Sequence, residues 1–270
     1  MVDSKLQAQL RAKFNPDGSD LRRVQMRMLD MLKYIDKVCR EIGVEYWLSS
    51  GTCLGAVRHG GFIPWDDDVD IEMMDDDYRK FTTYVKQHPH DEFVFQDHST
   101  DPHYVATFGK MRDLKTKLSV IKKDKFHDKY IYQGCSIDVF PMSLSNSKKI
   151  AQLGRYIYGI NYVLEAYNFP FPRTLSRVAY YVVQNVISVP FRWVTKLGAK
   201  DRIRHKLPNV FVAPRYISDI FPIKRISFED TALPVPGNYD SYLRKLYGDY
   251  DKLPVVEDIH PHTVAVDFLE

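Results

Sequence analysis

The fold is decided by one stretch of the sequence, YWLSSGTCLGAVRHGGFIPWDDDVDI, which runs from Tyr46 to Ile71. Tyr46–Leu48 is expected to be a short strand, after which Ser49–Thr52 opens a helix over Cys53–Arg58. Two glycines and a proline then predict a loop. Val69–Met73 alternates apolar and acidic residues, which is the pattern of a half-buried strand. The acidic residues therefore gather where the loop meets the second strand.

Three aspartates carry the chemistry that this pattern predicts. Side chains two residues apart on a strand project from the same face, so Asp68 and Asp70 point together. Two carboxylates held this close repel each other unless a cation lies between them. A third carboxylate, Asp138, lies on another alternating strand, Ser136–Phe140, which Pro141 is expected to end. Hard oxygen ligands suit Mg²⁺ or Mn²⁺, so Asp68, Asp70 and Asp138 are the predicted catalytic and metal-binding residues of a phosphoryl-transfer site.

The turn at Gly51 offers a different kind of ligand. A glycine between a strand and a helix lets backbone N–H groups approach a phosphate, and the helix N-terminus favours the anion. Ser50, Gly51 and Thr52 are therefore candidate ligands of a substrate diphosphate. The order of this turn, the helix and the Asp-x-Asp strand resembles the signature of the nucleotidyltransferase fold.

Other interpretations of the acidic residues are weaker. A calcium loop numbered from Asp66 would need glycine at the place of Ile71. A solvated acidic surface accounts for Asp75–Asp77 but not for acids on an otherwise apolar strand. Asp138 taken alone could equally be a structural, ion-paired carboxylate.

Outside this stretch the sequence predicts helices packed on a mixed sheet. A helix is expected from Leu21 to Gly43, with Ser19 or Asp20 as its N-cap, and another over Asp76–Gln87 with Asp75 as its cap. Further strands are expected over Phe93–Phe95 and Tyr104–Met111. Residues 147–206 have mainly helical patterns, and the proline-rich remainder contains one short helix around Tyr239–Tyr247 and a weak metal candidate, His260 with His262.

These elements predict an α/β (α+β) fold class, a nucleotidyltransferase-like mixed sheet with packed helices and a helical subdomain. We expect a catalytic core over residues 1–145 and a C-terminal segment over 211–270 that packs back on it. Between them, residues 146–210 are expected to form a helical insertion that could face the acceptor or a membrane. A chain of 270 residues can bury such a core without disulfides.

Composition restricts the partners and the location. A net charge of +3 is too small to imply nucleic-acid binding. The three cysteines have no CxxC spacing and the first residues do not resemble a signal peptide, so a cytoplasmic location is expected, with the inner face of the membrane as a possible site of action. The uncharged stretch Val178–Phe191 is too short to span a bilayer, which takes roughly 20 residues. It precedes a basic run, which predicts either peripheral membrane contact or a buried helix with a solvated end.

The stretch from Tyr46 to Ile71 resembles the central motif of the LicD family, bacterial phosphocholine transferases related to the animal fukutin-type ribitol-phosphate transferases. The resemblance extends to Asn15–Asp20, Gly109–Asp113, Ile137–Pro141 and Tyr247–Tyr250. It implies transfer of phosphocholine from CDP-choline, or a similar CDP-linked donor, to a hydroxyl of a glycan or glycolipid acceptor such as lipopolysaccharide, teichoic acid or capsule.

The resemblance also implies roles for residues. Asp68 and Asp70 would bind Mg²⁺ or Mn²⁺, Asp138 would be the third ligand or the general base, and Ser50, Gly51 and Thr52 would receive the diphosphate. Lys110 and Arg112 alternate on one strand and could reach donor phosphates. Arg58 is a candidate phosphate clamp or a structural partner of the acidic loop, Trp65 could contact the donor, and the lone His59 is more often a packing residue.

Three alternatives remain open from the sequence. The donor could carry ribitol- or glycerol-phosphate in place of phosphocholine. Attack could occur at the α-phosphorus, which would be nucleotidyl transfer. A glycan- or membrane-binding module without activity is the third, and the intact set of acids argues against it.

Overall fold

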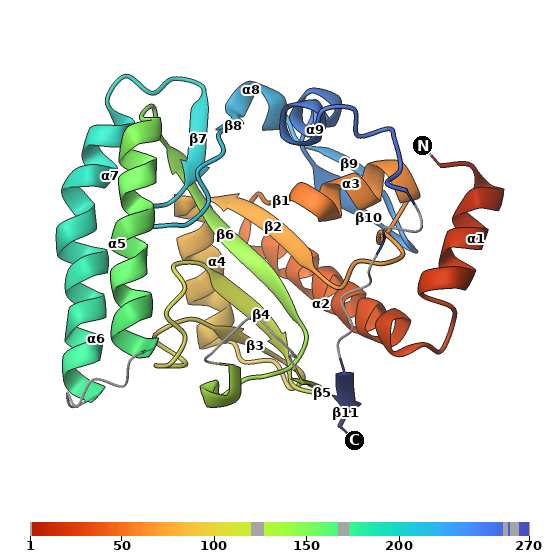
Figure 1. Cartoon of the computed structure of the whole chain (residues 1–270), viewed down its shortest axis with the longest axis horizontal. Coiled ribbons are helices and arrows are strands. Elements are labelled where there is room, and N and C mark those ends of the chain that lie inside the picture. Colours follow the sequence, from red (N-terminus) through yellow and green to blue (C-terminus); the bar gives the residue numbers. More distant parts are fainter. Residues whose placement is uncertain (1, 120–126, 167–172, 256–258, 260–264, 270) are drawn as a thin grey trace.

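A seven-stranded mixed sheet forms the centre of the molecule (Figure 1). The computed structural model describes residues 2–119, 127–166, 173–255, 259 and 265–269. The strand order is β1-β2-β6-β4-β3, with β7 on β6 and β8 on β7. Among the described strands of this sheet, β2 and β6 pair in parallel and all other pairs are antiparallel. The strands are β1 (Trp47–Leu48), β2 (Val69–Met74), β3 (Phe93–Gln96), β4 (Gly109–Asp113), β6 (Ser136–Leu144), β7 (Arg202–His205) and β8 (Arg215–Tyr216). Two ribbons join β9 (Lys224–Phe228) to β10 (Thr231–Val235) and β5 (Thr116–Ser119) to β11 (Ala265–Phe268).

The helices lie around this sheet. They are α1 (Ser4–Phe14), α2 (Asp20–Ile42), α3 (Ser50–His59), α4 (Asp75–Gln87), α5 (Lys148–Ala166), α6 (Arg173–Val182), α7 (Ser188–Lys196), α8 (Ile217–Ile220) and α9 (Tyr239–Tyr247), with a 3₁₀ turn η1 (His127–Lys129) and a π-helical segment η2 (Val183–Ile187). The α+β fold class predicted from the sequence is confirmed.

Helix α2 begins and ends where its sequence signals predict. The Ser19 hydroxyl accepts the N–H of Arg22 at 3.3 Å, and Gly43 ends the helix with a φ of +65°. Its apolar stripe and that of α4 pack on one face of the sheet, over the buried side chains of β2 and β6. The alternate residues of those strands, including the acids, therefore project from the opposite face.

Strand β6 shows that one prediction was wrong. Pro141 was expected to end it, yet the strand continues to Leu144. Pro141 lies opposite Met73 in the parallel pairing, and its carbonyl accepts the N–H of Lys206 at 2.8 Å. A proline removes only the donor of a strand residue, so the ladder continues through its acceptor.

Three further local predictions need correction. Asp75 is the first residue of α4 rather than its cap, and its carboxylate pairs with Lys206 at 2.6 Å. The strand expected from Tyr104 begins only at Gly109. The basic run at Arg202–His205, expected to be helical, is β7. For Asp75 and for β7, a partner distant in the sequence accompanies the difference, whereas the Tyr104 N–H is donated locally to the Asp101 carbonyl.

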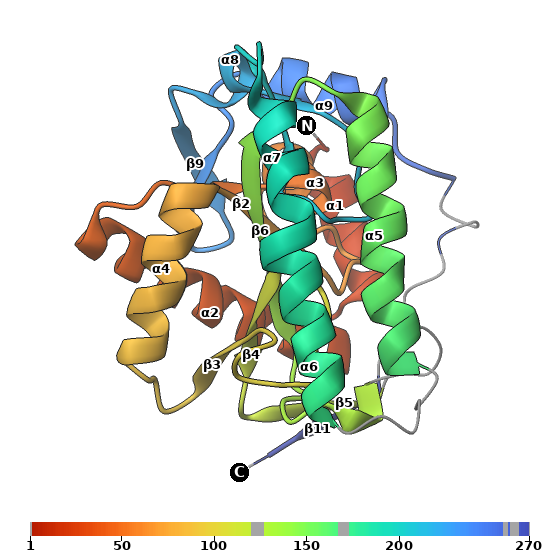
Figure 2. The same ribbon diagram turned by 90° about the vertical axis from the view of Figure 1, so that its left-hand side faces the viewer.

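Helices α5, α6 and α7 form a layer along one side of the molecule (Figure 2). They lie within the predicted insertion, residues 146–210, whose last part is β7 of the main sheet. The division of the chain into three segments stays a prediction. No helix within the described ranges is both long and apolar enough to cross a bilayer.

Candidate active site

A row of charged residues crosses three neighbouring strands. Asp70 of β2 lies directly opposite Asp138 of β6, and Asp138 lies opposite Lys110 of β4. The Lys110 ammonium forms an ion pair with an Asp138 carboxylate oxygen. Two aspartates that are far apart in the sequence are thus neighbours on one face of the sheet, with one lysine beside them.

The electrostatics of Asp70 reveal how crowded this face is. Burial of its carboxyl raises its pKa well above the ordinary value, and the negative charges of Asp138 and Asp68 raise the pKa further. Lys110 opposes this effect. Asp68 and Asp138 are therefore close enough to Asp70 to influence its ionisation. The single positive charge of Lys110 does not balance the charge of the three carboxylates.

The acidic loop before β2 supplies more carboxylates than the sequence analysis selected. Oxygen atoms of Asp66, Asp67 and Asp68 lie within 4.8 Å of one another, and this is the one group that tight among the residues that the structure describes. Asp68, Asp70 and Asp138 are more widely spread. Asp66 thus joins Asp68 as a carboxylate at the rim of the site.

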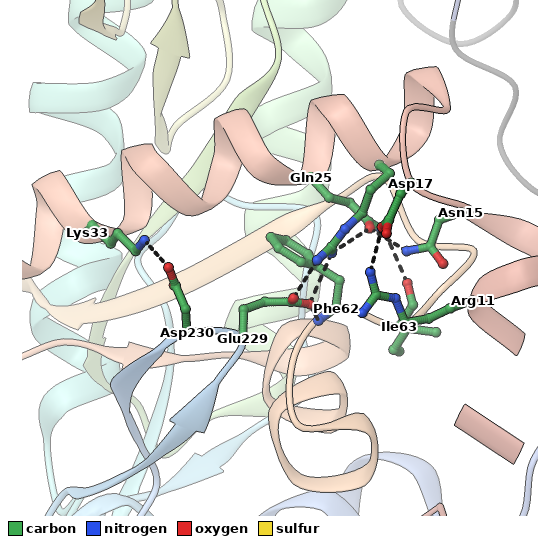
Figure 3. A network of polar contacts seen from close by, with 10 residues as sticks. Arg11, Asn15, Asp17, Gln25, Lys33, Phe62, Ile63, Glu229 and Asp230 are labelled. Atoms are coloured by element: carbon green, nitrogen blue, oxygen red, sulfur yellow. Dashed lines mark hydrogen bonds and ion pairs between the residues drawn. The ribbon is translucent and has the colours of Figure 1, made fainter. Parts of the chain in front are cut away.

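A polar network holds this loop in place (Figure 3). Gln25 of α2 donates from its side-chain amide to the carbonyl oxygens of Asp66 (2.9 Å) and Ile63 (3.3 Å). Glu229, between β9 and β10, accepts the N–H of Phe62 at 3.2 Å. Helix α2 and a hairpin from the C-terminal part of the chain therefore determine where the acidic loop lies.

The start of α3 faces the same carboxylates. Ser50 has a φ of +47°, in the left-handed region that costs a non-glycine residue about 1–2 kcal/mol. A Cβ atom on Gly51 would lie 3.2 Å from an Asp66 oxygen, so the backbone approaches the acids closely here. The Thr52 hydroxyl accepts the N–H of Asp70 at 2.8 Å and ties the helix to β2. All three predicted diphosphate ligands therefore border the acidic face.

A buried ion pair, absent from the sequence predictions, supports this helix start. Glu72 is fully buried on the same face as Asp70, and Arg215 of β8 lies 3.2 Å from it. Burial opposes ionisation of Glu72, but the positive charge of Arg215 and the contact with His205 lower its pKa to about 2. The alternation Asp68, Asp70, Glu72 could have revealed Glu72; nothing local marks Arg215.

Arg215 also reaches the turn itself. Its Nε donates to the Tyr242 hydroxyl at 3.2 Å and its Nη2 lies 3.4 Å from the Ser50 hydroxyl. The Tyr242 hydroxyl also accepts the N–H of Ser50 at 3.3 Å. The Nη1 of Arg215 is buried and has no hydrogen-bond partner among the described residues. A guanidinium thus lies behind the predicted phosphate turn, and both N–H groups of its Nη1 are without a hydrogen-bond partner among the described residues.

Tyr247 of α9 is a second residue at this site that sequence analysis did not select. Burial raises the pKa of its phenol to about 12, the charge of Asp70 adds to the effect, and Arg215 opposes it. The tyrosine therefore lies beside both the acids and the turn. With eighteen tyrosines in the chain, no sequence signal distinguishes this one.

Two predicted phosphate ligands are engaged elsewhere. Arg58 is buried, and its Nη1 donates to the carbonyls of Tyr250 (3.0 Å) and Lys252 (3.3 Å). Arg112 is also buried and donates to Gln96 at 2.7 Å and to the Gly134 carbonyl at 2.8 Å. Both guanidinium groups hold the fold together, so we leave them out of the site proposed below.

Trp65 and His59 belong to the packing between α1 and α3. The Trp65 ring contacts Phe14 and His59 edge to face, at 5.3 and 5.8 Å between centroids. His59 accepts from Arg58 at 3.0 Å and its other nitrogen lies 2.7 Å from the Gln7 side-chain oxygen. Donor contact by Trp65 stays a prediction, and the His260–His262 pair lies outside the described residues.

The donor set fits a hard divalent cation. Asp68, Asp70 and Asp138 offer only carboxylate oxygen atoms, and the charges of Asp138 and Asp68 add to burial in raising the Asp70 pKa. A cation such as Mg²⁺ or Mn²⁺ would relieve that repulsion, and such ions are commonly held by one or two carboxylates together with substrate phosphates. Those three side chains are the ones that would hold it.

Comparison with known sequences identifies relatives. The family described as "LicD/FKTN/FKRP, nucleotidyltransferase domain" matches residues 43–191, more than half of the chain. A lipopolysaccharide cholinephosphotransferase, LicD of Haemophilus influenzae, is 27% identical over 262 residues, which cover 92% of this chain and 98% of that protein.

Shorter matches link the chain to animal proteins. The mouse ribitol-5-phosphate transferase FKTN is 43% identical over 53 residues, which cover 20% of this chain and 12% of that protein. The human ribitol 5-phosphate transferase FKRP is 54% identical over 39 residues, which cover 14% of this chain and 8% of that protein. The similarity to these larger proteins is thus local, whereas the similarity to the bacterial enzyme extends along both chains.

Proposed function

The chain belongs to the LicD/FKTN/FKRP family, and from that premise we propose that it transfers phosphocholine from CDP-choline to a hydroxyl of a cell-surface glycan in a metal-dependent reaction. Family membership makes it a phosphotransferase. The observation that carries the choice of phosphocholine is the similarity to a lipopolysaccharide cholinephosphotransferase along nearly the whole of both chains. Lipopolysaccharide is accordingly the acceptor that we propose.

The carboxylates on the open face of the sheet have distinct roles in this proposal. Asp68, Asp70 and Asp138 would hold Mg²⁺ or Mn²⁺, and such an ion would supply positive charge that neutralises the donor diphosphate and polarises its reacting phosphorus. Asp138 accepts the proton of the acceptor hydroxyl. The hydroxyl oxygen then bonds to the β-phosphorus, the bond from that phosphorus to the bridging oxygen breaks, and CMP leaves with the electron pair.

The cations and the turn position the donor. Ser50, Gly51 and Thr52 bind the diphosphate through backbone N–H groups at the start of α3. Lys110 lies beside Asp138 and Arg215 lies beside Ser50, and their positive charge favours the same anion. The three cysteines are buried and free, which suits the reducing cytoplasm as the place of the reaction.

Product identification tests the proposal. The purified chain is incubated with CDP-choline, Mg²⁺ and extracted lipopolysaccharide, and products are analysed by phosphorus NMR and mass spectrometry. We expect CMP release together with a phosphocholine-sized gain in glycan mass, both abolished by EDTA. Release of phosphocholine with a CMP-sized gain would mean attack at the α-phosphorus and would replace the proposal by nucleotidyl transfer.

Ribitol-phosphate transfer is the second candidate, because the local matches to FKTN and FKRP have the higher identities. The same assay with CDP-ribitol, and with CDP-glycerol, tests it. A turnover with CDP-ribitol that exceeds the turnover with CDP-choline would favour this candidate. Failure of every CDP-linked donor would overturn both.

A further inference from the structure

The outer helical layer buries several polar side chains and exposes many apolar ones. Along α6, η2 and α7 the residues that face inward include Gln184, Ser188 and Thr195, and the last two are only 1% and 2% exposed. Trp193 and Leu197 point outward and are 71% and 72% exposed. A helix that packs on a soluble core normally shows the opposite arrangement. The apolar side of this layer is therefore directed at something other than the core.

Helix α5 also exposes a row of apolar side chains, although its buried residues Ala151 and Ile157 are apolar too. Leu153, Tyr156, Ile160 and Val163 recur at intervals of three and four residues and all are exposed, Tyr156 to 75%. Of the 19 large exposed hydrophobic residues in the described ranges, 13 lie between Leu153 and Leu197. Both views show α5, α6 and α7 side by side on the outside of the molecule (Figures 1 and 2). We call these 13 side chains the apolar face.

The charge of the same segment is strongly positive. Between Lys148 and Lys200 the sequence has one acid, Glu165, and eight basic residues. The segment carries a charge of +7, whereas the whole chain carries +3, so the remainder is net acidic. Lys148, Lys149, Arg155 and Lys196 are exposed in the described helices. The apolar face is thus surrounded by cations.

We propose that the apolar face docks on a membrane surface rich in anionic lipids. Apolar side chains accompanied by basic ones, with an exposed tryptophan and tyrosine among them, are what an interfacial helical surface requires. A second copy of the chain is disfavoured as the occupant, because two such faces would bring like charges together. The proposal concerns lipid binding and does not depend on which donor the site uses.

Docking would also bring a cavity to the lipid surface. A cavity of about 720 Å³ lies between this layer and the sheet, and Val178 and Tyr181 of the apolar face form part of its wall. Phe108 and Pro141, close in sequence to Lys110 and Asp138, form another part. If the acceptor is a glycolipid, as the proposed function has it, the cavity opens beside the surface in which that acceptor is anchored.

Vesicle binding tests this inference on the full chain without any substrate. Vesicles of pure phosphatidylcholine are compared with vesicles that also contain phosphatidylglycerol, by co-sedimentation. We expect binding to the anionic vesicles, weaker binding at high salt, and a blue shift in tryptophan emission that Trp193→Phe removes. Trp193→Glu combined with Leu197→Glu is expected to weaken binding by about tenfold or more.

Ile131→Glu is the matched control, since Ile131 is 60% exposed outside this layer, and it should bind as the wild type does. All variants should melt at the wild-type temperature, because the changed side chains are exposed. Equal binding to both kinds of vesicle, or equal loss of binding in the control, would overturn the inference. So would a dimer in light scattering that the double variant dissociates, with no vesicle binding.

Discussion

Glu72 and Arg215 form the buried ion pair on which the geometry of the predicted diphosphate turn depends. Glu72 accepts a hydrogen bond from the Trp47 indole at 2.8 Å and faces Arg215 at 3.2 Å. Because Arg215 also contacts Tyr242 and the Ser50 hydroxyl, this pair joins the middle of β2 to the start of α3. A single side chain thus supports the fold and the site at once.

Arg215→Met should therefore damage both stability and activity. It leaves Glu72 buried without its partner, which we expect to lower the free energy of unfolding by about 3–5 kcal/mol. Adding Glu72→Gln should restore most of this stability without restoring turnover, because the guanidinium beside Ser50 is still missing. Urea unfolding and kcat/KM for all members of the mutant cycle measure the two effects. Recovery of activity in the double variant would assign Arg215 a purely structural role.

Asp70→Asn should separate activity from stability in a different way. Burial and the neighbouring acids raise the Asp70 pKa, so its charged form is disfavoured in the metal-free protein. The neutral amide should leave the melting temperature unchanged or higher while turnover falls by at least about a hundredfold. Asp76→Asn is the matched control, since Asp76 is exposed on α4 and pairs only with Arg79 among the described contacts. Wild-type turnover in Asp70→Asn would contradict the proposed metal site.

At the scale of elements, α3 packs against the loop that follows it too closely for a side chain at Gly55. A Cβ atom on Gly55 would lie 2.5 Å from the Gly61 carbonyl oxygen, because the helix packs directly on the loop that leads to the acids. Gly61 is close-packed as well, because a Cβ atom added to it would lie 2.3 Å from a Glu229 side-chain oxygen. Gly55 thus permits close approach of backbone to backbone, and Gly61 makes room for the Glu229 side chain.

Two glycine-to-alanine changes should have opposite effects. Gly55→Ala forces the Gly61 backbone to move, so it should destabilise the protein by about 1–3 kcal/mol. Gly159 lies in α5 and its added Cβ would meet nothing within 4 Å, so Gly159→Ala should stabilise by about 0.5–1 kcal/mol. Thermal unfolding of both variants measures the difference. Equal changes of the melting temperature in the two variants would mean that the loop at Gly61 moves away from α3 at little cost.

The contact between α1 and α3 should respond to pH through His59. Burial and the charge of Arg58 lower the His59 pKa from 6.5 to about 3. The unfolded chain binds a proton near pH 6.5 and the folded chain does not, so stability should fall as the pH drops below 6.5. His59→Gln should remove up to about 1 kcal/mol of this loss between about pH 7.5 and 5.5. The measurement is the urea unfolding midpoint of the wild type and of His59→Gln as a function of pH. The same pH dependence in both proteins would contradict the lowered His59 pKa.

At the scale of the whole molecule, the site is an assembly of distant segments. Asp70, Lys110, Asp138 and Arg215 come from four different strands, and Tyr247 comes from a C-terminal helix. Loss of the tertiary fold would therefore disperse the acids, and a cation that binds them should stabilise the folded state as a whole.

Mg²⁺ should raise the melting temperature of the wild-type chain. A concentration a hundredfold above its dissociation constant corresponds to about 2.7 kcal/mol of added stability, if the unfolded chain does not bind the ion. EDTA should reverse the shift and Asp70→Asn should show none. A melting temperature insensitive to Mg²⁺ and to Mn²⁺, in a protein whose turnover requires them, would mean that the ion arrives only with the donor.

Local patterns alone determined much of this structure. The caps and apolar stripe of α2 and the alternation in β2 and β6 follow from residues a few positions apart, and the structure has them where they were predicted. Helix α3 was predicted as well, but it begins at Ser50 rather than Cys53, and β6 continues past Pro141. The candidate acids were found for the same reason, since residues two apart on a strand share a face.

Only the tertiary structure decided which of these features meet. The register that sets Asp70 beside Asp138, the contacts that bury Arg58 and Arg112, and the arrival of Arg215 behind Ser50 all depend on chain segments far apart in the sequence. The same holds for the basic run that became β7 and for the outward apolar face of the helical layer. Amphipathicity determines that a helix has two faces, but packing against the rest of the chain determines which face is left to the outside.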